Sequence, residues 1–556
     1  MNTKLNYTFA FTGKSIVLFL LFQLCYATVT NGQTSVNKRF DNLSLETLIP
    51  IRPGEPGKSP FWNMNAQRFI YAPAFNMPEV NGASKYLFTI KSGGNKSQQF
   101  TAAKPWAVLS PIWNDVPEGY TTLTVEGTDA SGKVVGTSGE RSFYRSPSFN
   151  GNAGKATLTY AEAGRIGIKA IYDAPHVQHW LINGKPDPTY ARYCYPSKVI
   201  GGLLRAMAEY ATVANNKTDR DKALQIARFT ADYLLSKKLP SNYRYSSIPP
   251  TYMDDDINKP VENAVDPLAK NWFMVPSSVD PALGFLDLYD VTKDTKYFDA
   301  AKAIAKTLLN TQDSDGTWPY MANKITGEPV VAQRLIPTWI IFFYDRLEKQ
   351  YKIKDFREAR NRAWQWIVNN TLKTFQWDGQ FEDIKPRAPY MNLAREQACD
   401  VATLLLSDTK NSKANMAQAE ELLRFAEDQF VVWAPLTDPE GWRKAMPDRR
   451  KNFDKWMTPN VLEQYACYDP VARSSAILIK AYLKANEVTK KPIYLTKAKA
   501  LTNSLLAAQS WMSKEYKGNG EIPTWVMTTK PVNWLNNSYY AADAVLNFGL
   551  YESVKK

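Results

Sequence analysis

The stretch KALQIARFTADYLL, residues 222–235, repeats apolar side chains at positions i, i+3, i+4 and i+7. This spacing places one apolar stripe along a helix of 3.6 residues per turn, so it predicts an amphipathic helix. Blocks of the same period recur along residues 156–556, and we count twelve: 160–172, 198–214, 219–236, 278–291, 295–311, 333–350, 355–371, 393–407, 413–432, 469–486, 494–510 and 537–552. This part of the chain is therefore predicted to be helical.

The helical blocks form a repeat of one hairpin. Five blocks end in a short polar turn that leads into a second helix beginning near an alanine: NNKTDRDKAL, TKDTKYFDAA, KIKDFREAR, DTKNSKANMAQA and TKKPIYLTKA. Repeated helical pairs are typical of ring and solenoid architectures. With the first and last helices, the repeat gives six pairs. We therefore predict an (α/α)6 toroid, and an open superhelix of hairpins is the alternative.

The connections between hairpins are long, and antiparallel pairing brings all of them to one end of the ring. They cover residues 173–197, 237–275, 312–332, 372–392, 433–468 and 511–536. Loops are normally polar, yet these hold ten of the sixteen tryptophans: Trp180, Trp272, Trp318, Trp377, Trp433, Trp442, Trp456, Trp511, Trp525 and Trp534. This distribution predicts an aromatic-walled cleft that suits sugar rings. The alternative is that the tryptophans pack the loops onto the ring.

Two other segments precede the toroid. Residues 1–32 combine Lys4 and Lys14 with the short apolar run SIVLFLLFQLCYA and small residues, the pattern of a secretory signal peptide. Residues 40–150 hold short alternating runs such as KYLFTIKS and YTTLTVEGTDASGK, separated by turn residues. Such runs predict a small all-β sandwich of the immunoglobulin or fibronectin type. The expected fold class is thus mostly α, with this sandwich before the toroid.

Charge and cysteine content narrow the classes of partner. The formal net charge is +14 and the lysines are spread along the chain, without a nucleic-acid motif. We therefore expect an acidic polysaccharide or oligosaccharide as partner, with no nucleic acid and no stable membrane span after signal cleavage. Cys194, Cys399 and Cys467 are too few for a disulfide scaffold or a four-cysteine metal site. The expected location is periplasmic or secreted.

Two connections share one phrase, an Asp-Gly turn after a helix followed by an aromatic residue. The segments are LLNTQDSDGTW (308–318) and TLKTFQWDGQFED (371–383). Asp-Gly supplies a left-handed turn that aims the next side chains back over the ring. With these motifs, the helical region resembles the (α/α)6 carbohydrate-active enzymes: exo-β-glucuronidases, unsaturated glucuronyl hydrolases and toroid polysaccharide lyases. The resemblance implies a glycan-degrading enzyme acting on uronic-acid-containing substrates.

Glycoside hydrolysis requires two carboxylates that flank the scissile bond. The candidates are Glu382 and Asp383, with a partner from Asp254, Asp255 or Asp256, or from Glu396. The substrate-binding residues expected around them are Tyr252, Trp318, Trp377, Gln380, Arg395 and Glu396. Arg395 and Lys198 begin helices, so each is placed to hold a substrate carboxylate beside a helix N-terminus.

Uronate elimination requires a base, an acid and a group that neutralises the carboxylate. The segments HVQHW and ARYCYPSK hold both histidines of the chain and supply such groups. His176, His179 and Tyr195 are the catalytic candidates, and Trp180, Arg192, Tyr193 and Lys198 are binding candidates. Two histidines without a third ligand do not predict a metal site, and the chemistry needs no cofactor.

Three functions therefore follow from the sequence. Glycoside hydrolysis of a uronic-acid-containing glycan is preferred, polysaccharide lyase chemistry is the alternative, and non-catalytic glycan binding is the third possibility.

Overall fold

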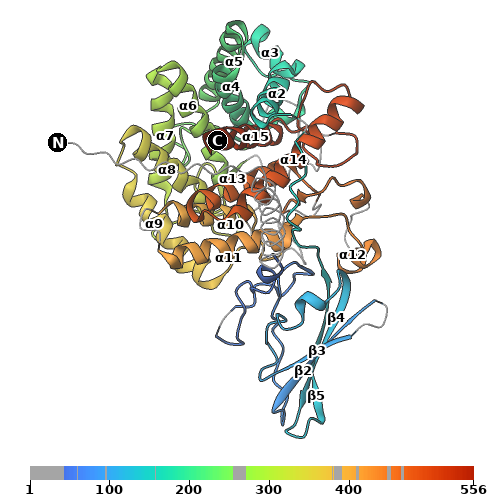
Figure 1. Cartoon of the computed structure of the whole chain (residues 1–556). Coiled ribbons are helices and arrows are strands. Elements are labelled where there is room, and N and C mark those ends of the chain that lie inside the picture. The colour runs from blue at the N-terminus through green and yellow to red at the C-terminus, as the bar shows by residue number, and fades with distance from the viewer. Residues whose placement is uncertain are drawn as a thin grey trace, which may run out of the picture.

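The computed structural model describes residues 43–58, 60–93, 97–156, 158–253, 271–378, 380, 391–408, 412–446, 452–464, 469–531 and 533–555. The chain is mostly helical, with a small sheet region at one side of the helical part (Figure 1). The expected signal peptide, residues 1–32, lies outside the described residues. Within the described part of the chain, none of the helices combines the length and apolar character that crossing a membrane requires.

Six inner helices form a closed ring. Each contacts the next, and the last contacts the first: α4 (Gly201–Val213), α6 (Val279–Thr292), α8 (Thr338–Tyr351), α10 (Glu396–Ser407), α13 (Ala472–Thr489) and α15 (Leu535–Lys555). Each inner helix also packs against an outer helix: in the same order α5 (Lys217–Ser236), α7 (Thr295–Thr311), α9 (Arg357–Ile367), α11 (Lys413–Phe430), α14 (Pro492–Glu515) and α2 (Tyr160–Asp173). Because α15 contacts both α4 and α2, the ring is closed, as the predicted toroid requires.

Local sequence explains where the hairpins turn. Asn216, Asp294 and Ser412 each accept a hydrogen bond from a backbone N–H in the first turn of α5, α7 and α11, so they act as N-caps. The inner helices α6 and α13 are followed by the C-cap residues Lys293 and Lys490, which adopt left-handed φ values of 58° and 59°. These turns reverse the chain within a few residues. The long connections therefore run from the end of each outer helix to the N-terminal end of the next inner helix.

The ring closes where α2 packs against α15 at very short range. A Cβ atom added to Gly164 would lie 2.5 Å from the backbone nitrogen of Leu546. A Cβ atom added to Gly549 would lie 2.3 Å from the backbone nitrogen of Ala161. Both contacts are with backbone, which cannot turn aside as a flexible side chain can. Glycine at these positions therefore sets the distance between the first and the last helix.

The N-terminal region contains one five-stranded sheet in the order β1-β5-β4-β2-β3. The strands are β1 (Arg68–Phe69), β2 (Lys85–Ser92), β3 (Ser97–Ala102), β4 (Gly119–Thr128) and β5 (Val134–Arg145). The sandwich prediction is not confirmed, because the described strands of this region form this single sheet. Non-strand segments cover its buried face: the rings of Phe75 and Trp113 lie 5.6 and 6.0 Å from that of Phe143.

The buried side chain of Asp428 explains why β1 is short. The run RFIYAPAF, residues 68–75, leaves the sheet after Phe69 because the backbone N–H groups of Ile70 and Tyr71 donate to Asp428 Oδ1 at 2.6 and 2.8 Å. Asp428 lies in α11, so the same contact fixes the sheet region to the ring. Arg68 strengthens the attachment by donating to the carbonyl of Val431 at 2.6 Å. Figure 1 shows the sheet extending away from the helices below α11 and α12 (Pro439–Ala445).

Glycine at position 164 can be tested directly. We expect Gly164→Ala to destabilise the fold by about 1–3 kcal/mol, because the added methyl group must displace the backbone of α15. The matched control is Gly93→Ala, where an added Cβ meets no atom within 4 Å. Urea unfolding of both variants measures the difference. Equal midpoints for Gly164→Ala and the wild-type chain would contradict the close contact.

Candidate functional site

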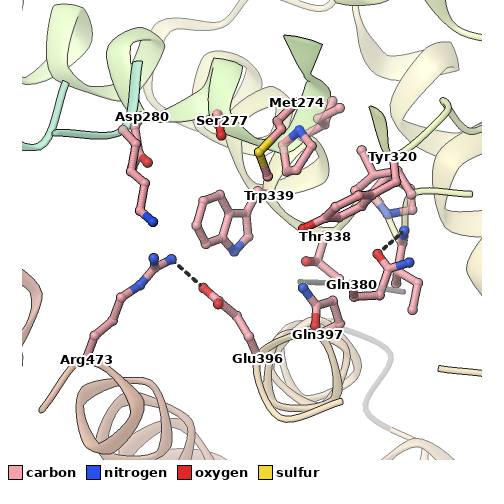
Figure 2. A pocket seen from close by; sticks show the side chains of 16 residues that line it. Met274, Ser277, Asp280, Tyr320, Thr338, Trp339, Gln380, Glu396, Gln397 and Arg473 are labelled. Carbon is pink, nitrogen blue, oxygen red and sulfur yellow. Dashed lines mark hydrogen bonds and ion pairs between the residues drawn. The ribbon is translucent and has the colours of Figure 1, made fainter. Parts of the chain in front are cut away.

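A pocket opens at the N-terminal ends of the inner helices, where the predicted toroid places its functional face. We call it the central pocket. Its lining residues are Lys198, Met274, Pro276, Ser277, Asp280, Tyr320, Leu335, Ile336, Pro337, Thr338, Trp339, Ile340, Gln380, Glu396, Gln397 and Arg473. They come from α6, α8, α10 and α13, from the segments that precede these helices, and, for Lys198, from the turn before α4. Figure 2 shows Asp280 and Glu396 reaching into the pocket from different helices.

Asp280 is a buried carboxyl group near the start of α6. Its Oδ1 accepts a hydrogen bond from the hydroxyl of Tyr540 and lies 3.9 Å from Nη1 of Arg205. Burial raises the pKa of Asp280, and the cations Arg473 and Arg205 oppose that shift only in part. Asp280 therefore retains its proton to a higher pH than an exposed aspartate, which suits a group that donates a proton.

Glu396 is the first residue of α10 and lies in a different environment. Its Oε1 is 2.9 Å from Nη2 of Arg473, and its Oε2 is 3.9 Å from Nη2 of Arg395. Figure 2 marks the pair with Arg473. Glu396 is thus fixed at the start of α10 beside two guanidinium groups, which suits a base or a nucleophile.

Trp339 forms an aromatic wall of the central pocket. Its indole ring lies 5.1 Å from the guanidinium carbon of Arg473, a cation–π contact. Beneath it, Asp400 accepts a hydrogen bond from Thr338 Oγ1 at 2.8 Å. Burial, reinforced by the charge of Glu396, raises the pKa of Asp400. Asp400 is therefore a positioning group that holds the start of α8, while Trp339 faces the pocket.

Lys198 supplies a second cation to the central pocket. It lies in a π-helical turn, Pro196–Ile200, immediately before α4. Its Nζ is 5.1 Å from the ring of Trp534 and 6.0 Å from that of Tyr195. Insertions of this kind in a helix often occur at functional sites, because they redirect side chains. With Lys198 and Arg473, the lining of the pocket holds two cations beside the carboxyl groups of Asp280 and Glu396.

The structure brings three of the predicted site residues together in the central pocket: Lys198, Gln380 and Glu396. Arg395 lies directly behind them and is buried. It donates to the carbonyl of Leu462 at 3.2 Å and to Ser474 Oγ. Glu382 and Asp383, the predicted carboxylate pair, lie outside the described residues, as do Asp254, Asp255 and Asp256. Their catalytic role stays a prediction.

The histidine segment is not part of the pocket lining. The predicted first connection contains a helix, α3 (Pro175–Asn183), with proline in its first turn and Gly184 as left-handed C-cap. His176 stacks on Tyr190 with a centroid distance of 3.9 Å, and burial lowers its pKa to about 4. His179 lies one turn further along α3. His176 is therefore neutral near pH 7 and is held against its own connection.

The aromatic binding candidates of the same connection pack against one another. Trp180 Nε1 donates to the hydroxyl of Tyr193 at 3.1 Å, and both residues are fully buried. Tyr195 contacts Tyr252 with a centroid distance of 5.6 Å. Arg192 stacks on Trp534 at 4.1 Å, and Tyr252 reaches Met274 Sδ at 3.6 Å. Because Met274 and Lys198 line the central pocket, this cluster supports its wall from behind.

Two tryptophans of the Asp-Gly segments are packing residues. Trp318 is fully buried and its Nε1 donates to the carbonyl of Leu308 at 2.9 Å. Trp377 is fully buried too, with its ring 5.5 Å from that of Phe425. These two pack the connections onto the ring, which was the alternative to an aromatic cleft. The tryptophan that lines the central pocket is Trp339, which belongs to an inner helix.

Sequence reasoning missed four residues: Asp280, Trp339, Asp400 and Arg473. A signal was present, because α6, α10 and α13 are predominantly apolar helices, each with charged residues at inward positions. A charge in such a helix must be paired or functional. Among the described residues, no group of three His, Cys, Asp or Glu side chains is placed to hold a metal ion.

Comparison with known proteins gives weak similarities only. No family model matches the chain, and no curated protein matches it. A family 76 glycoside hydrolase from a bovine Bacteroides thetaiotaomicron strain has a TM-score of 0.46 at 12% identity, covering 87% of this chain and 96% of that one. Cellobiose 2-epimerase from Spirochaeta thermophila has 0.44 at 13% identity, covering 70% and 97%.

An unsaturated glucuronyl hydrolase specific for heparin gives a TM-score of 0.40 at 12% identity, covering 71% of this chain and 97% of that one. It is one of the enzyme groups that the sequence motifs resemble. Scores of this size do not transfer an activity, so the chemistry has to be argued from the central pocket.

The buried carboxyl of Asp400 should make stability depend on pH. Its folded-state pKa is raised above the ordinary value of 3.8, so the folded chain binds this proton more tightly than the unfolded chain does. The contribution of Asp400 to the free energy of unfolding is therefore lost as pH rises from about 4 towards its raised pKa. We expect Asp400→Asn to have a smaller loss of unfolding free energy between pH 5 and pH 8 than the wild type.

The matched control is Asp221→Asn, an exposed position on α5. It should leave the pH dependence unchanged. Urea titrations at several pH values measure both variants. A difference between Asp400→Asn and wild type that is the same at every pH would contradict a raised pKa at this position.

Proposed function

We propose that this chain is a glycoside hydrolase that acts on a uronic-acid-containing glycan in the central pocket. One observation carries the proposal. Asp280 and Glu396 enter the same pocket from different helices, α6 and α10, in opposite environments. Burial raises the pKa of Asp280, which accepts from Tyr540, whereas Glu396 is paired directly with Arg473. Two carboxyl groups made different by their surroundings are what glycoside hydrolysis requires.

The roles follow from these environments. Asp280 protonates the glycosidic oxygen as the bond to the leaving sugar breaks. Glu396 either accepts a proton from the water that attacks the anomeric carbon, or attacks that carbon itself to form a glycosyl-enzyme that water then hydrolyses. Trp339 offers a flat apolar surface for a sugar ring. Tyr540, which donates to Asp280, positions that carboxyl group.

The acidic character of the substrate rests on the two cations of the pocket. Arg473 is paired with Glu396, and Lys198 lies over aromatic rings. A substrate carboxylate that enters the pocket is therefore met by an ammonium group and by the guanidinium group of Arg473. We infer that a uronate unit binds here. Secretion to the periplasm, based on residues 1–32, belongs to the same proposal.

Polysaccharide lyase chemistry is the second candidate. One observation favours it: the pocket that holds these two cations is also lined by Tyr320. A tyrosine near a neutralised uronate can remove a proton next to the carboxylate. In this lyase hypothesis Tyr320 takes the role of the base in place of His176 and His179, because neither histidine lines the central pocket.

Two variants test the hydrolase proposal. Glu396→Gln and Asp280→Asn should each lower kcat by about 100-fold or more, because each removes a proton-transfer or charge-stabilising group. Asp299→Asn, an exposed position on α7, is the matched control and should retain full activity. The assay measures reducing ends and ultraviolet absorbance on glucuronate, galacturonate and sulfated glycans.

Reducing ends without new absorbance are expected, since hydrolysis creates no double bond. Full activity of Glu396→Gln would contradict the assignment of its role. Turnover of none of the acidic glycans would contradict the substrate class.

A further inference from the structure

A second hollow adjoins the central pocket at the rim of the ring. We call it the rim hollow, and its lining residues are Ala332, Gln333, Arg334, Ile336, Trp366, Asn370, Thr371, Thr374, Gln376, Asp378 and Gln380. It shares Ile336 and Gln380 with the central pocket. The two cavities therefore adjoin each other at these side chains.

Gln380 forms a fixed partition between the two cavities. It is buried, with an exposed fraction of 5%. Its Oε1 accepts from the backbone N–H of Ile336 at 2.9 Å, and its Nε2 donates to the carbonyl of Arg334 at 2.8 Å. Because its amide is held at both ends, the relative position of the two cavities is set by the backbone. A rigid arrangement of this kind suits binding of a chain with regularly spaced units.

Thr371 provides an independent sign that the rim hollow binds a ligand. It is 1% exposed, and its hydroxyl group has no hydrogen-bond partner among the described residues. A buried hydroxyl group without a partner costs free energy unless something else satisfies it. Thr371 belongs to a π-helical turn, Val368–Leu372, that follows α9. This is the second such turn beside a cavity, after the one that carries Lys198.

The chemistry of the rim hollow differs from that of the central pocket. Trp366 is half-buried and presents an aromatic group, and its neighbours Gln333, Asn370 and Gln376 are amides. The charge of Arg334 is neutralised by Asp313 and Asp315, each at 2.7 Å. An aromatic wall with amide groups suits the apolar face and hydroxyl groups of an uncharged sugar. Arg334, already paired with two carboxylates, therefore differs from the cations of the central pocket.

We propose that the rim hollow is a second sugar-binding subsite, which holds a neutral sugar attached to the unit in the central pocket. The proposal rests on the proposed function for its chemistry, and it goes further by specifying the substrate. The substrate is then an oligomer or polymer in which a uronate is linked to an uncharged sugar. A single uronate with a small leaving group fills only half of the site.

Two substitutions in the rim hollow test the subsite. Trp366→Ala should weaken binding of an oligosaccharide with a neutral sugar beside the uronate by about 10-fold, as loss of one aromatic contact predicts. Thr371→Val, which keeps the side-chain shape, should weaken it too and leave the unfolding midpoint equal or higher. Trp364→Ala is the matched control, since this partly buried tryptophan of α9 is not among the lining residues of either cavity.

Binding is measured by titration calorimetry in the Glu396→Gln background, with that oligosaccharide and with an aryl uronide that lacks the second sugar. Turnover of both is measured in the otherwise wild-type chain. The subsite predicts a loss for the oligosaccharide alone. Equal losses for both ligands, or no loss for either, would overturn it.

The design separates this proposal from the proposed function. Binding that depends on Trp366, without turnover by the wild-type chain, supports the subsite and contradicts the hydrolase. Turnover that depends on Asp280, without any advantage of the oligosaccharide over the aryl uronide, overturns the subsite and supports the hydrolase.

Discussion

Closing six helical pairs into a ring forces the N-terminal ends of six inner helices to face one another. Everything at the central pocket depends on this constraint. Glu396 is the first residue of α10, and Asp280 is the second residue of α6. Helix N-termini carry partial positive charge, so converging ends favour carboxylates and anionic ligands. The close contact of α2 with α15 at Gly164 keeps the ring, and hence this convergence, in place.

Ion pairing offsets the desolvation free energy of the charged side chains near the centre of the ring. Arg473 contacts Glu396, while Arg205 lies near Asp280 and contacts Asp287 at 3.1 Å. Buried ion pairs add little net stability, because desolvation offsets most of their attraction. A fold that only needed to be stable would be served as well by apolar residues. The retained charges at the open end of the ring therefore point to binding and chemistry.

Much of the fold could be predicted because apolar periodicity reports directly on helices and strands. Residues 295–311 were predicted as a helix and form α7 with the same bounds, and KYLFTIKS forms β2. The short strand β1 could not be foreseen, since it depends on Asp428, far along the chain. The sandwich is not confirmed, because alternation identifies strands but does not say whether they share one sheet.

The site was harder to predict because chemistry depends on which charged residues face inward. Glu396 was predicted as a partner carboxylate, Lys198 because it begins a helix, and Gln380 because it follows an Asp-Gly turn. Asp280 and Arg473 were missed because each lies inside an apolar helical block, where sequence alone does not give the side-chain direction. The tryptophan-rich connections predicted an aromatic cleft, but a long connection also needs apolar side chains that pack it onto the helices. Trp318 is such a residue, buried in the core.

Asp280 and Glu396 are proposed to hydrolyse a glycosidic bond. The most direct measurement is turnover of the acidic oligosaccharide in water enriched in oxygen-18, with immediate reduction of the products and mass spectrometry. Hydrolysis breaks the bond between the anomeric carbon and the bridging oxygen, so we expect one heavy oxygen atom at the new reducing end. Elimination leaves the bridging oxygen on that carbon. A product with ordinary oxygen there and a new double bond in the other fragment would contradict hydrolysis by Asp280 and Glu396.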